Sequence, residues 1–341
     1  MRRRDCSEHG PSPGDLRAAS AALAGLLIMT GCRSAGAVAG SLPGASAIGL
    51  SPRHLRLDAE SLEATGARGQ ARLVMTPEQR SVRLEDAVAD LASADVVFLG
   101  ELHDNTEGHA VQLALTRGLA DARGSLILSM EMLERDVQRR LDLYLDGVLT
   151  EEEFLSGTRQ WGNYAQHYRG AVELARERGF HVVAGNVYRP IASRVARRGL
   201  AAGAGDPWAA RSVDVSDGEY KRRFLDVMSG GHGGVGGPEP DAAFLERVFA
   251  AQCIKDDTMA ESIALAMADA GEPVPIVVHW NGRFHSDYGL GTVERLRRRV
   301  PGLNIAVVSM IETEDLDREL VGDEVDQGHY VIMVPPEADG G

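Results

Sequence analysis

Residues 95–105 read Asp95-Val-Val-Phe-Leu-Gly100-Glu-Leu-His-Asp-Asn105, and this stretch decides the fold class. A short apolar run that ends at a glycine is typical of a β-strand buried on both faces. Polar side chains capable of chemistry follow the glycine at once. Three later segments repeat the arrangement of an apolar run followed by a polar residue: 125–131, 181–186 and 275–285.

The polar residues after these four runs are His103, Glu131, Asn186 and His285. In an open parallel sheet, the carboxyl ends of the strands lie along one edge, and ligands bind there. The sequence therefore predicts that these four side chains converge on one crevice. Two of the four sites share the spacing Gly-x-x-His, at residues 100–103 and 282–285.

Amphipathic helical patterns alternate with the apolar runs. Helical spacing of apolar residues appears at 84–94, 111–119, 137–145 and 171–178, and further strands are expected at 304–309 and 329–334. This alternation is typical of βαβ units. Between 186 and 273 the sequence instead predicts four helices, at 191–200, 217–228, 241–252 and 258–268. The predicted fold is α/β, a mostly parallel sheet flanked by helices, with a small all-helical subdomain.

The amino-terminal segment has the pattern of a targeting signal. Arginines at 2–4 and 17 precede an apolar run, 18–29, that is too short to span a bilayer. The run ends in Met29-Thr-Gly-Cys32, which looks like a bacterial lipobox with Cys32 as the lipidated residue. The alternative is an ordinary secretory signal cut near Ala35.

These patterns divide the chain into four parts. Residues 1–31 are expected to be a lipoprotein signal peptide, 32–80 the lipidated cysteine and a flexible tether, 81–335 the α/β domain with its helical insertion at about 190–272, and 336–341 a tail. The tether expectation follows from a composition rich in alanine, glycine and serine. The protein would be held in the bacterial cell envelope by lipid, facing the periplasm or the cell surface.

Charge and cysteine content exclude several classes. The net charge of −14 argues against a nucleic-acid partner. Of the three cysteines, Cys6 would be removed and Cys32 lipidated, which leaves Cys253 alone. An intramolecular disulfide and a paired-cysteine metal site are therefore not expected.

Glu101, His103, Glu131 and His285 together suit a divalent metal ion, because imidazole and carboxylate ligands with open positions are typical of Zn, Mn and Fe sites. The alternative is that these groups cap helices and bind loop backbone. For the two histidines together, the repeated Gly-x-x-His after a strand favours a functional role.

The chain resembles the ChaN-like haem-binding lipoproteins, which belong to the same superfamily as the Tiki and TraB proteins. Five motifs carry the resemblance: Gly100-Glu101-Leu102-His103-Asp104-Asn105 with His109 and Gln112; Glu131-Met132 with Arg135, Gln138 and Tyr144; Trp161-x-x-Tyr164-x-x-x-Tyr168; Ala251-Gln252-x-x-x-Asp256-x-x-Met259-Ala260; and Gly282-x-x-His285. The second Gly-x-x-His departs from the family in its bulky Arg283-Phe284, which makes an open metal site there doubtful.

The resemblance implies a parallel sheet flanked by helices, with a small helical domain. It implies an envelope lipoprotein linked to iron acquisition, in which a tyrosine ligates haem iron and two subunits of a homodimer stack their haems. A histidine from the partner subunit would contact the haem propionates, and His109 is a further candidate for cofactor binding. The wider superfamily implies a competing function, a metal-dependent hydrolase that uses Glu101, His103, Glu131 and His285. A third alternative is an envelope binding scaffold without catalysis.

Tyr164, Tyr168 and Tyr288 are the candidate haem ligands, since they lie nearest the motifs. A phenol must lose its proton to bind ferric iron, and Arg169 is expected to help Tyr164 or Tyr168 do so. The alternative is that Trp161, Tyr164 and Tyr168 form one helical face packed in the core. His167 and His232 are expected to be solvated.

Overall fold

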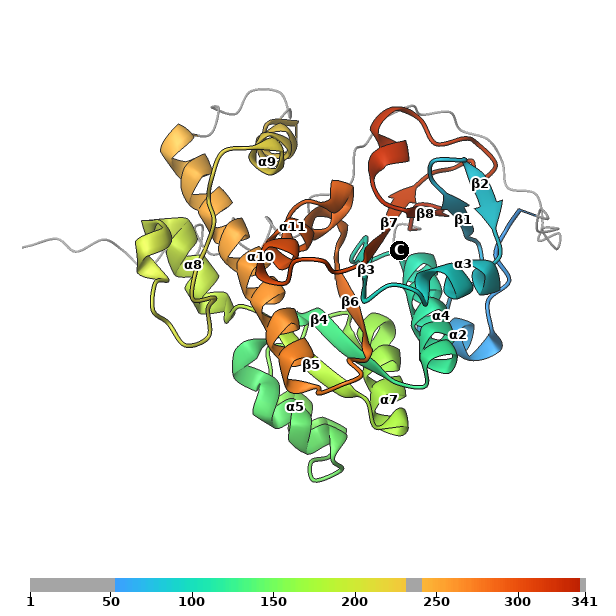
Figure 1. Ribbon diagram of the computed structural model, residues 1–341, viewed down its shortest axis with the longest axis horizontal. Helices are drawn as coiled ribbons and strands as arrows, with labels where there is room; N and C mark the ends of the chain where they lie inside the picture. The colour runs from blue at the N-terminus through green and yellow to red at the C-terminus, as the bar shows by residue number, and fades with distance from the viewer. Residues whose placement is uncertain (1–52, 231–240, 338–341) are drawn as a thin grey trace, which may run out of the picture.

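The computed structural model describes residues 53–230 and 241–337, and its centre is a mostly parallel sheet (Figure 1). In this part of the chain the sheet has eight strands in the order β2-β1-β8-β7-β3-β6-β4-β5. The six from β8 to β5 are parallel to one another, and β1 pairs antiparallel with both β2 and β8. The predicted fold class is confirmed. The strands are β1 Arg72–Met75, β2 Arg80–Val82, β3 Val96–Glu101, β4 Leu126–Glu134, β5 His181–Asn186, β6 Ile276–Gly282, β7 Ile305–Glu312 and β8 Tyr330–Val334.

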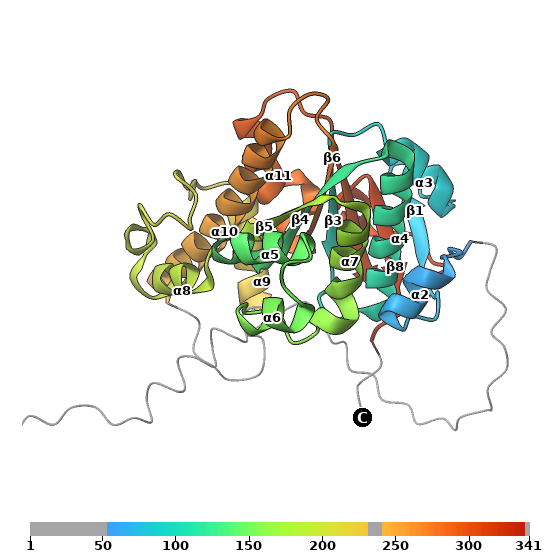
Figure 2. The same ribbon diagram turned by 90° about the horizontal axis from the view of Figure 1, so that it is seen from below.

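Helices cover both faces of the sheet. The main apolar core lies between the strands and α3 Leu84–Leu91, α4 Thr106–Arg123, α5 Gln138–Leu145, α6 Glu151–Ser156 and α7 Arg169–Arg178, and α2 Ala59–Thr65 packs outside it against α4. Figure 2 shows α2, α4, α5 and α7 in front of the strands. The opposite face is covered by α10 Ala242–Asp269 and α11 Thr292–Arg299 through a second core.

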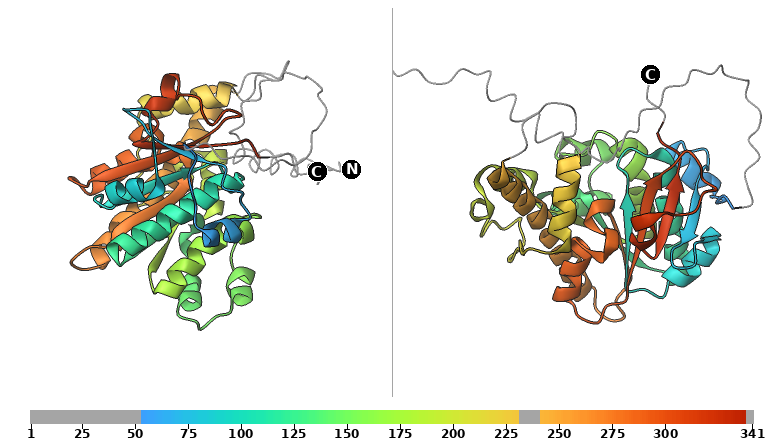
Figure 3. Two further views of the ribbon diagram at one scale, coloured as in Figure 1. Left: turned by 90° about the vertical axis from the view of Figure 1, so that its right-hand side faces the viewer. Right: turned by 90° about the horizontal axis from the view of Figure 1, so that it is seen from above.

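The predicted helical group is present, and it lies at the β5 side of the molecule. It consists of α8 Arg189–Arg198, α9 Glu219–Gly230 and the first half of α10, which share two small apolar clusters. Figure 3 shows this group and the β1–β2–β8 edge at opposite ends of the sheet. In the described part of the chain, no helix is long and apolar enough to cross a membrane.

Two element predictions are wrong. The helices expected at 241–252 and 258–268 are one continuous helix, α10, because neither glycine nor proline interrupts 242–269. The expected tether also ends too late, since α2, β1 and β2 lie between 59 and 82. Leu73 and Val82 of this stretch are buried in the main core. Two expectations fall outside the described residues: lipidation of Cys32 and solvation of His232.

Candidate functional site

The carboxyl ends of β3, β6 and β4 are adjacent. They bring together His103, Glu131 and His285, three of the four side chains predicted to converge. In register, Glu101 of β3 lies beside Gly282 of β6. The Gly282 N–H donates to Oε2 of Glu131 from β4 at 2.8 Å, and Nε2 of His285 lies 3.2 Å from Oε1 of the same carboxylate. We call Glu101, His103, Glu131 and His285 the strand-end site.

The two Gly-x-x-His motifs interlock across β3 and β6. A Cβ atom at Gly282 would lie 2.7 Å from Cε1 and 2.9 Å from Nε2 of His103. A Cβ atom at Gly100 would lie 3.0 Å from Cα of Arg283. Each glycine therefore makes room for a residue of the other motif, which is the physical reason for the repeated pattern.

Glu101 orients His103. Its Oε1 accepts hydrogen bonds from Nδ1 of His103 at 2.7 Å and from the Tyr168 hydroxyl at 2.8 Å. Burial lowers the pKa of His103, but the hydrogen bond and charge of Glu101 outweigh it, so the pKa is raised overall. Nε2 of His103 has no partner among the described residues, and 22% of the side chain is exposed. The imidazole therefore offers one free nitrogen at the edge of the sheet, backed by a carboxylate.

His285 is bound on both ring nitrogens. Nδ1 lies 2.7 Å from Oδ1 of Asp256, and Nε2 faces Glu131. Burial lowers the pKa of His285, but the charges of Glu131 and Asp256 outweigh it and raise the pKa to about 9. Burial likewise raises the pKa of Glu131, and the charge of His285 more than reverses this, so that pKa is strongly lowered. At neutral pH, His285 is an imidazolium between two carboxylates, with no lone pair free for a metal ion.

The metal-ion alternative consequently gains no support from the geometry. A metal ligand histidine must be neutral and have a free nitrogen, and only His103 of the pair meets the second condition. Within residues 53–230 and 241–337, no group of three or more His, Cys, Asp or Glu side chains is arranged to hold a metal ion. Asn186 lies at the same edge, but its amide donates to the backbone carbonyl of Glu131 at 3.0 Å.

Two of the candidate haem-ligating tyrosines, Tyr164 and Tyr168, are core residues. Tyr164 and Tyr168 lie in a π-helix, Tyr164–Tyr168, and both are buried in the main core. Burial raises the pKa of each phenol, and the charge of Glu101 adds to the rise at Tyr168. The charge of Arg169 lowers the pKa of Tyr164, as expected, but burial outweighs it, and the Arg169 guanidinium itself pairs with Glu151 at 2.6 Å. The core alternative is confirmed for Tyr164 and Tyr168, but the three aromatic residues do not form one helical face, because Trp161 precedes the helix and is only partly buried.

Two histidines near these tyrosines are also structural. His109 is fully buried, its Nε2 lies 3.1 Å from the His103 carbonyl, and burial lowers its pKa to about 4. His167 stacks on it with ring centroids 4.2 Å apart. His167 is buried, so the expectation that it is solvated is wrong. Tyr288 is partly buried, with the Arg223 guanidinium 3.5 Å from its ring centroid, and burial raises its pKa.

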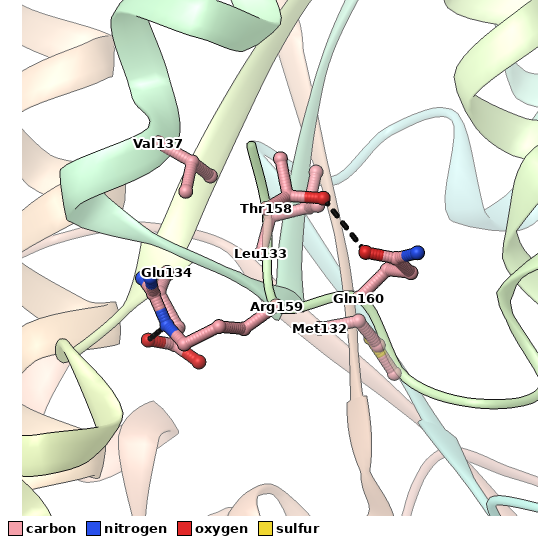
Figure 4. Close-up of a pocket in the computed structure, with 7 residues that line it drawn as sticks. All are labelled: Met132, Leu133, Glu134, Val137, Thr158, Arg159 and Gln160. Atoms are coloured by element: carbon pink, nitrogen blue, oxygen red, sulfur yellow. Dashed lines mark hydrogen bonds and ion pairs between the residues drawn. The ribbon is translucent and has the colours of Figure 1, made fainter. Parts of the chain in front are cut away.

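A small hollow lies at the end of β4, and none of the residues that line it belongs to the strand-end site (Figure 4). Arg159 on its rim donates to Glu134 at 2.9 Å and also pairs with Asp136. The space inside the hollow is far below the roughly 300–1,000 Å³ of pockets that enclose drug-sized ligands, and its charged side chains are already paired.

Sequence reasoning missed three contributors to the site. Asp256 and Gln252 of α10 both contact His285, and the Tyr220 hydroxyl of α9 donates to Oδ2 of Asp256 at 2.6 Å. Gln252 and Asp256 stand four residues apart, which places them on one face of a helix. That spacing within the Gln252-x-x-x-Asp256 motif is the signal that could have found them.

Comparisons with known proteins agree with this fold. The family model described as haem-binding uptake, Tiki superfamily, ChaN matches residues 87–296. A solved structure of cofacial heme binding to ChaN of Campylobacter jejuni is 19% identical, covers 78% of this chain and 98% of its own, and has a TM-score of 0.60. A Bacillus cereus protein is 9% identical over 81% of this chain and 96% of its own, with a TM-score of 0.42.

An erythromycin esterase in its open conformation is 11% identical over 70% of this chain and 77% of its own, with a TM-score of 0.41. No curated protein matches the sequence. The family match spans well over half of the chain and includes every residue of the strand-end site. The chain belongs to the ChaN family of haem-binding uptake proteins in the Tiki superfamily.

Proposed function

We propose that this protein binds haem at the strand-end site, with His103 as the residue that faces the iron. The observation that carries the proposal is the free Nε2 of a partly exposed His103 whose Nδ1 is bound to Glu101. A carboxylate behind a ligand imidazole fixes the ring and raises its basicity. Imidazole is a common axial ligand of haem iron.

The surroundings of His103 fit a flat apolar ligand. The Trp161 ring lies edge-on to the imidazole, with centroids 4.7 Å apart, and is itself partly exposed. Tyr164 and Tyr168 are less suited to the iron, because their phenols are buried and hard to ionise. Tyr288 stays the remaining tyrosine candidate, since it is partly exposed and lies three residues after His285.

The wider role is an envelope function in iron acquisition, with the chain anchored by lipid at Cys32. Family membership and the leader sequence support this role. The Campylobacter jejuni relative binds haem cofacially. By analogy, we propose that two copies of this chain form a homodimer around stacked haems.

Haemin titration of the full chain tests the haem site. We expect a Soret band to develop with the wild type and to be lost or strongly weakened with His103→Ala. Glu101→Gln removes the charge behind the imidazole and should weaken binding on the order of 10–100-fold. His181→Ala is the matched control, because His181 is exposed at the start of β5, the opposite end of that strand.

Two outcomes would contradict the proposal. A wild type that shows no haem complex rules out the function. A His103→Ala protein with an unchanged spectrum, beside a changed spectrum for Tyr288→Phe, would transfer the ligand role to Tyr288.

A further inference from the structure

Lysine is rare in this chain, and one of its lysines has no partner among the residues that the structure describes. Of the 36 basic residues, only Lys221 and Lys255 are lysines. Lys221 is partly buried and pairs with Asp217 at 2.6 Å and with Glu246 at 2.7 Å. Lys255 makes neither a hydrogen bond nor an ion pair with any residue that the structure describes, although its side chain is partly buried.

Lys255 lies on the face of α10 that points to the strand ends. Gln252, one turn before it, contacts the His285 ring at 3.2 Å, and Ser262, two turns after it, donates to the Gly185 carbonyl of β5 at 2.8 Å. Residues at this spacing share one side of a helix. Lys255 therefore lies between the end of β6 and the end of β5, beside the strand-end site.

The carboxylates around Lys255 are already paired with or hydrogen-bonded to other residues. The charges of Glu131, Asp256, Arg189 and Glu134 act most strongly on the Lys255 ammonium. Glu131 is held by His285 and the Gly282 N–H, and Asp256 by His285, Tyr220 and Thr292. Glu134 is held by Arg159 and the Arg189 backbone N–H. Burial of the unpartnered ammonium lowers the pKa of Lys255.

An ammonium group that is partly removed from water without a counter-ion is costly, and a bound anion removes that cost. We propose that Lys255 is the anion-binding group of the strand-end site and that it takes a carboxylate of the bound ligand. The inference rests on the proposed function, because the propionate side chains of haem supply that carboxylate. His103 would face the iron from β3, while Lys255 would hold the ligand from the α10 side.

Two porphyrins that differ only in their carboxylates test the assignment. We expect Lys255→Met to weaken haemin binding on the order of tenfold, the effect of losing one charge-assisted hydrogen bond. Lys255→Arg should restore part of the affinity. Haemin dimethyl ester, which lacks free carboxylates, should bind the wild type and Lys255→Met equally. Lys221→Met is the matched control and should bind haemin as the wild type does.

A second measurement keeps the inference testable if haem does not bind. Reductive methylation with ¹³C-formaldehyde labels the two lysines and the amino terminus. Adding sodium propionate should shift the Lys255 resonance and leave that of Lys221 in place, and inorganic phosphate distinguishes a general anion site from a carboxylate site. Equal haemin affinity of wild type and Lys255→Met, or no shift of Lys255 with propionate, would overturn the inference. Absence of any haemin complex contradicts the proposed function instead.

Discussion

At the scale of single residues, Gly282 decides whether His103 is correctly placed. The His103 ring occupies the space where a Cβ atom at 282 would lie, 2.7 Å from Cε1. Gly282→Ala should therefore push the imidazole aside and weaken haemin binding on the order of tenfold or more, with little loss of stability, since the end of a side chain can move. Gly100→Ala meets the Cα atom of Arg283 at 3.0 Å, so it should instead cost about 1–3 kcal/mol of stability. Haemin titration and urea unfolding of both variants separate the two effects, and wild-type affinity in Gly282→Ala would contradict the argument.

The two motif histidines also show how far sequence reasoning reaches at this scale. Their common Gly-x-x-His spacing after a strand correctly predicts that His103 and His285 meet at one edge. The spacing cannot predict that His103 keeps a free ring nitrogen whereas His285 is bound on both, because Asp256 holds the second nitrogen of His285. That carboxylate stands 29 positions from His285 and reaches it only because α10 packs across the sheet. Likewise, the burial that makes Tyr168 a poor phenolate is a property of tertiary packing.

At the scale of elements, α9 and α10 together hold His285 in its charged form. The bulky Phe284 of the second motif packs against Tyr220 of α9, with ring centroids 5.3 Å apart, and Tyr220 in turn donates to Asp256.

Because folding raises the pKa of His285 from an ordinary value of 6.5 to about 9, the contribution of His285 to stability is fully present below pH 6.5 and is lost as the pH rises to 9. We expect the free energy of unfolding to fall by on the order of 2–3 kcal/mol across this window. Asp256→Asn should flatten the fall, measured by urea unfolding from pH 6.5 to 9, whereas Asp217→Asn, which removes an exposed carboxylate, should not. Equal slopes for Asp256→Asn and wild type would show that this network does not hold the proton.

Element prediction succeeded where the hydrophobic period was clear. The buried strands β3, β4, β6 and β7 follow from apolar runs, and α4 and α7 from helical spacing. The hydrophobic pattern does not reveal the strands within residues 59–82, because β1 and β2 are only four and three residues long. These strands form because Leu73 and Val74 add to an existing sheet edge at β8, which no local pattern reveals.

At the scale of the whole molecule, the acidic chain needs an anchor if it is to act at a membrane. Its net charge is −14, so attraction to anionic lipid headgroups would not hold it there. We propose the lipobox-like Met29-Thr-Gly-Cys32 as the site of a lipid anchor with more than one acyl chain, since stable attachment takes more than one. We expect Cys32→Ala to move the protein from the membrane fraction to the aqueous fraction and to abolish labelling with palmitate. Cys253→Ala is the matched control, since Cys253 is a free, buried thiol inside α10 and should leave both properties unchanged. If the Cys32→Ala protein still sediments with membranes and incorporates palmitate, then the lipid is attached elsewhere and the leader is an ordinary secretory signal.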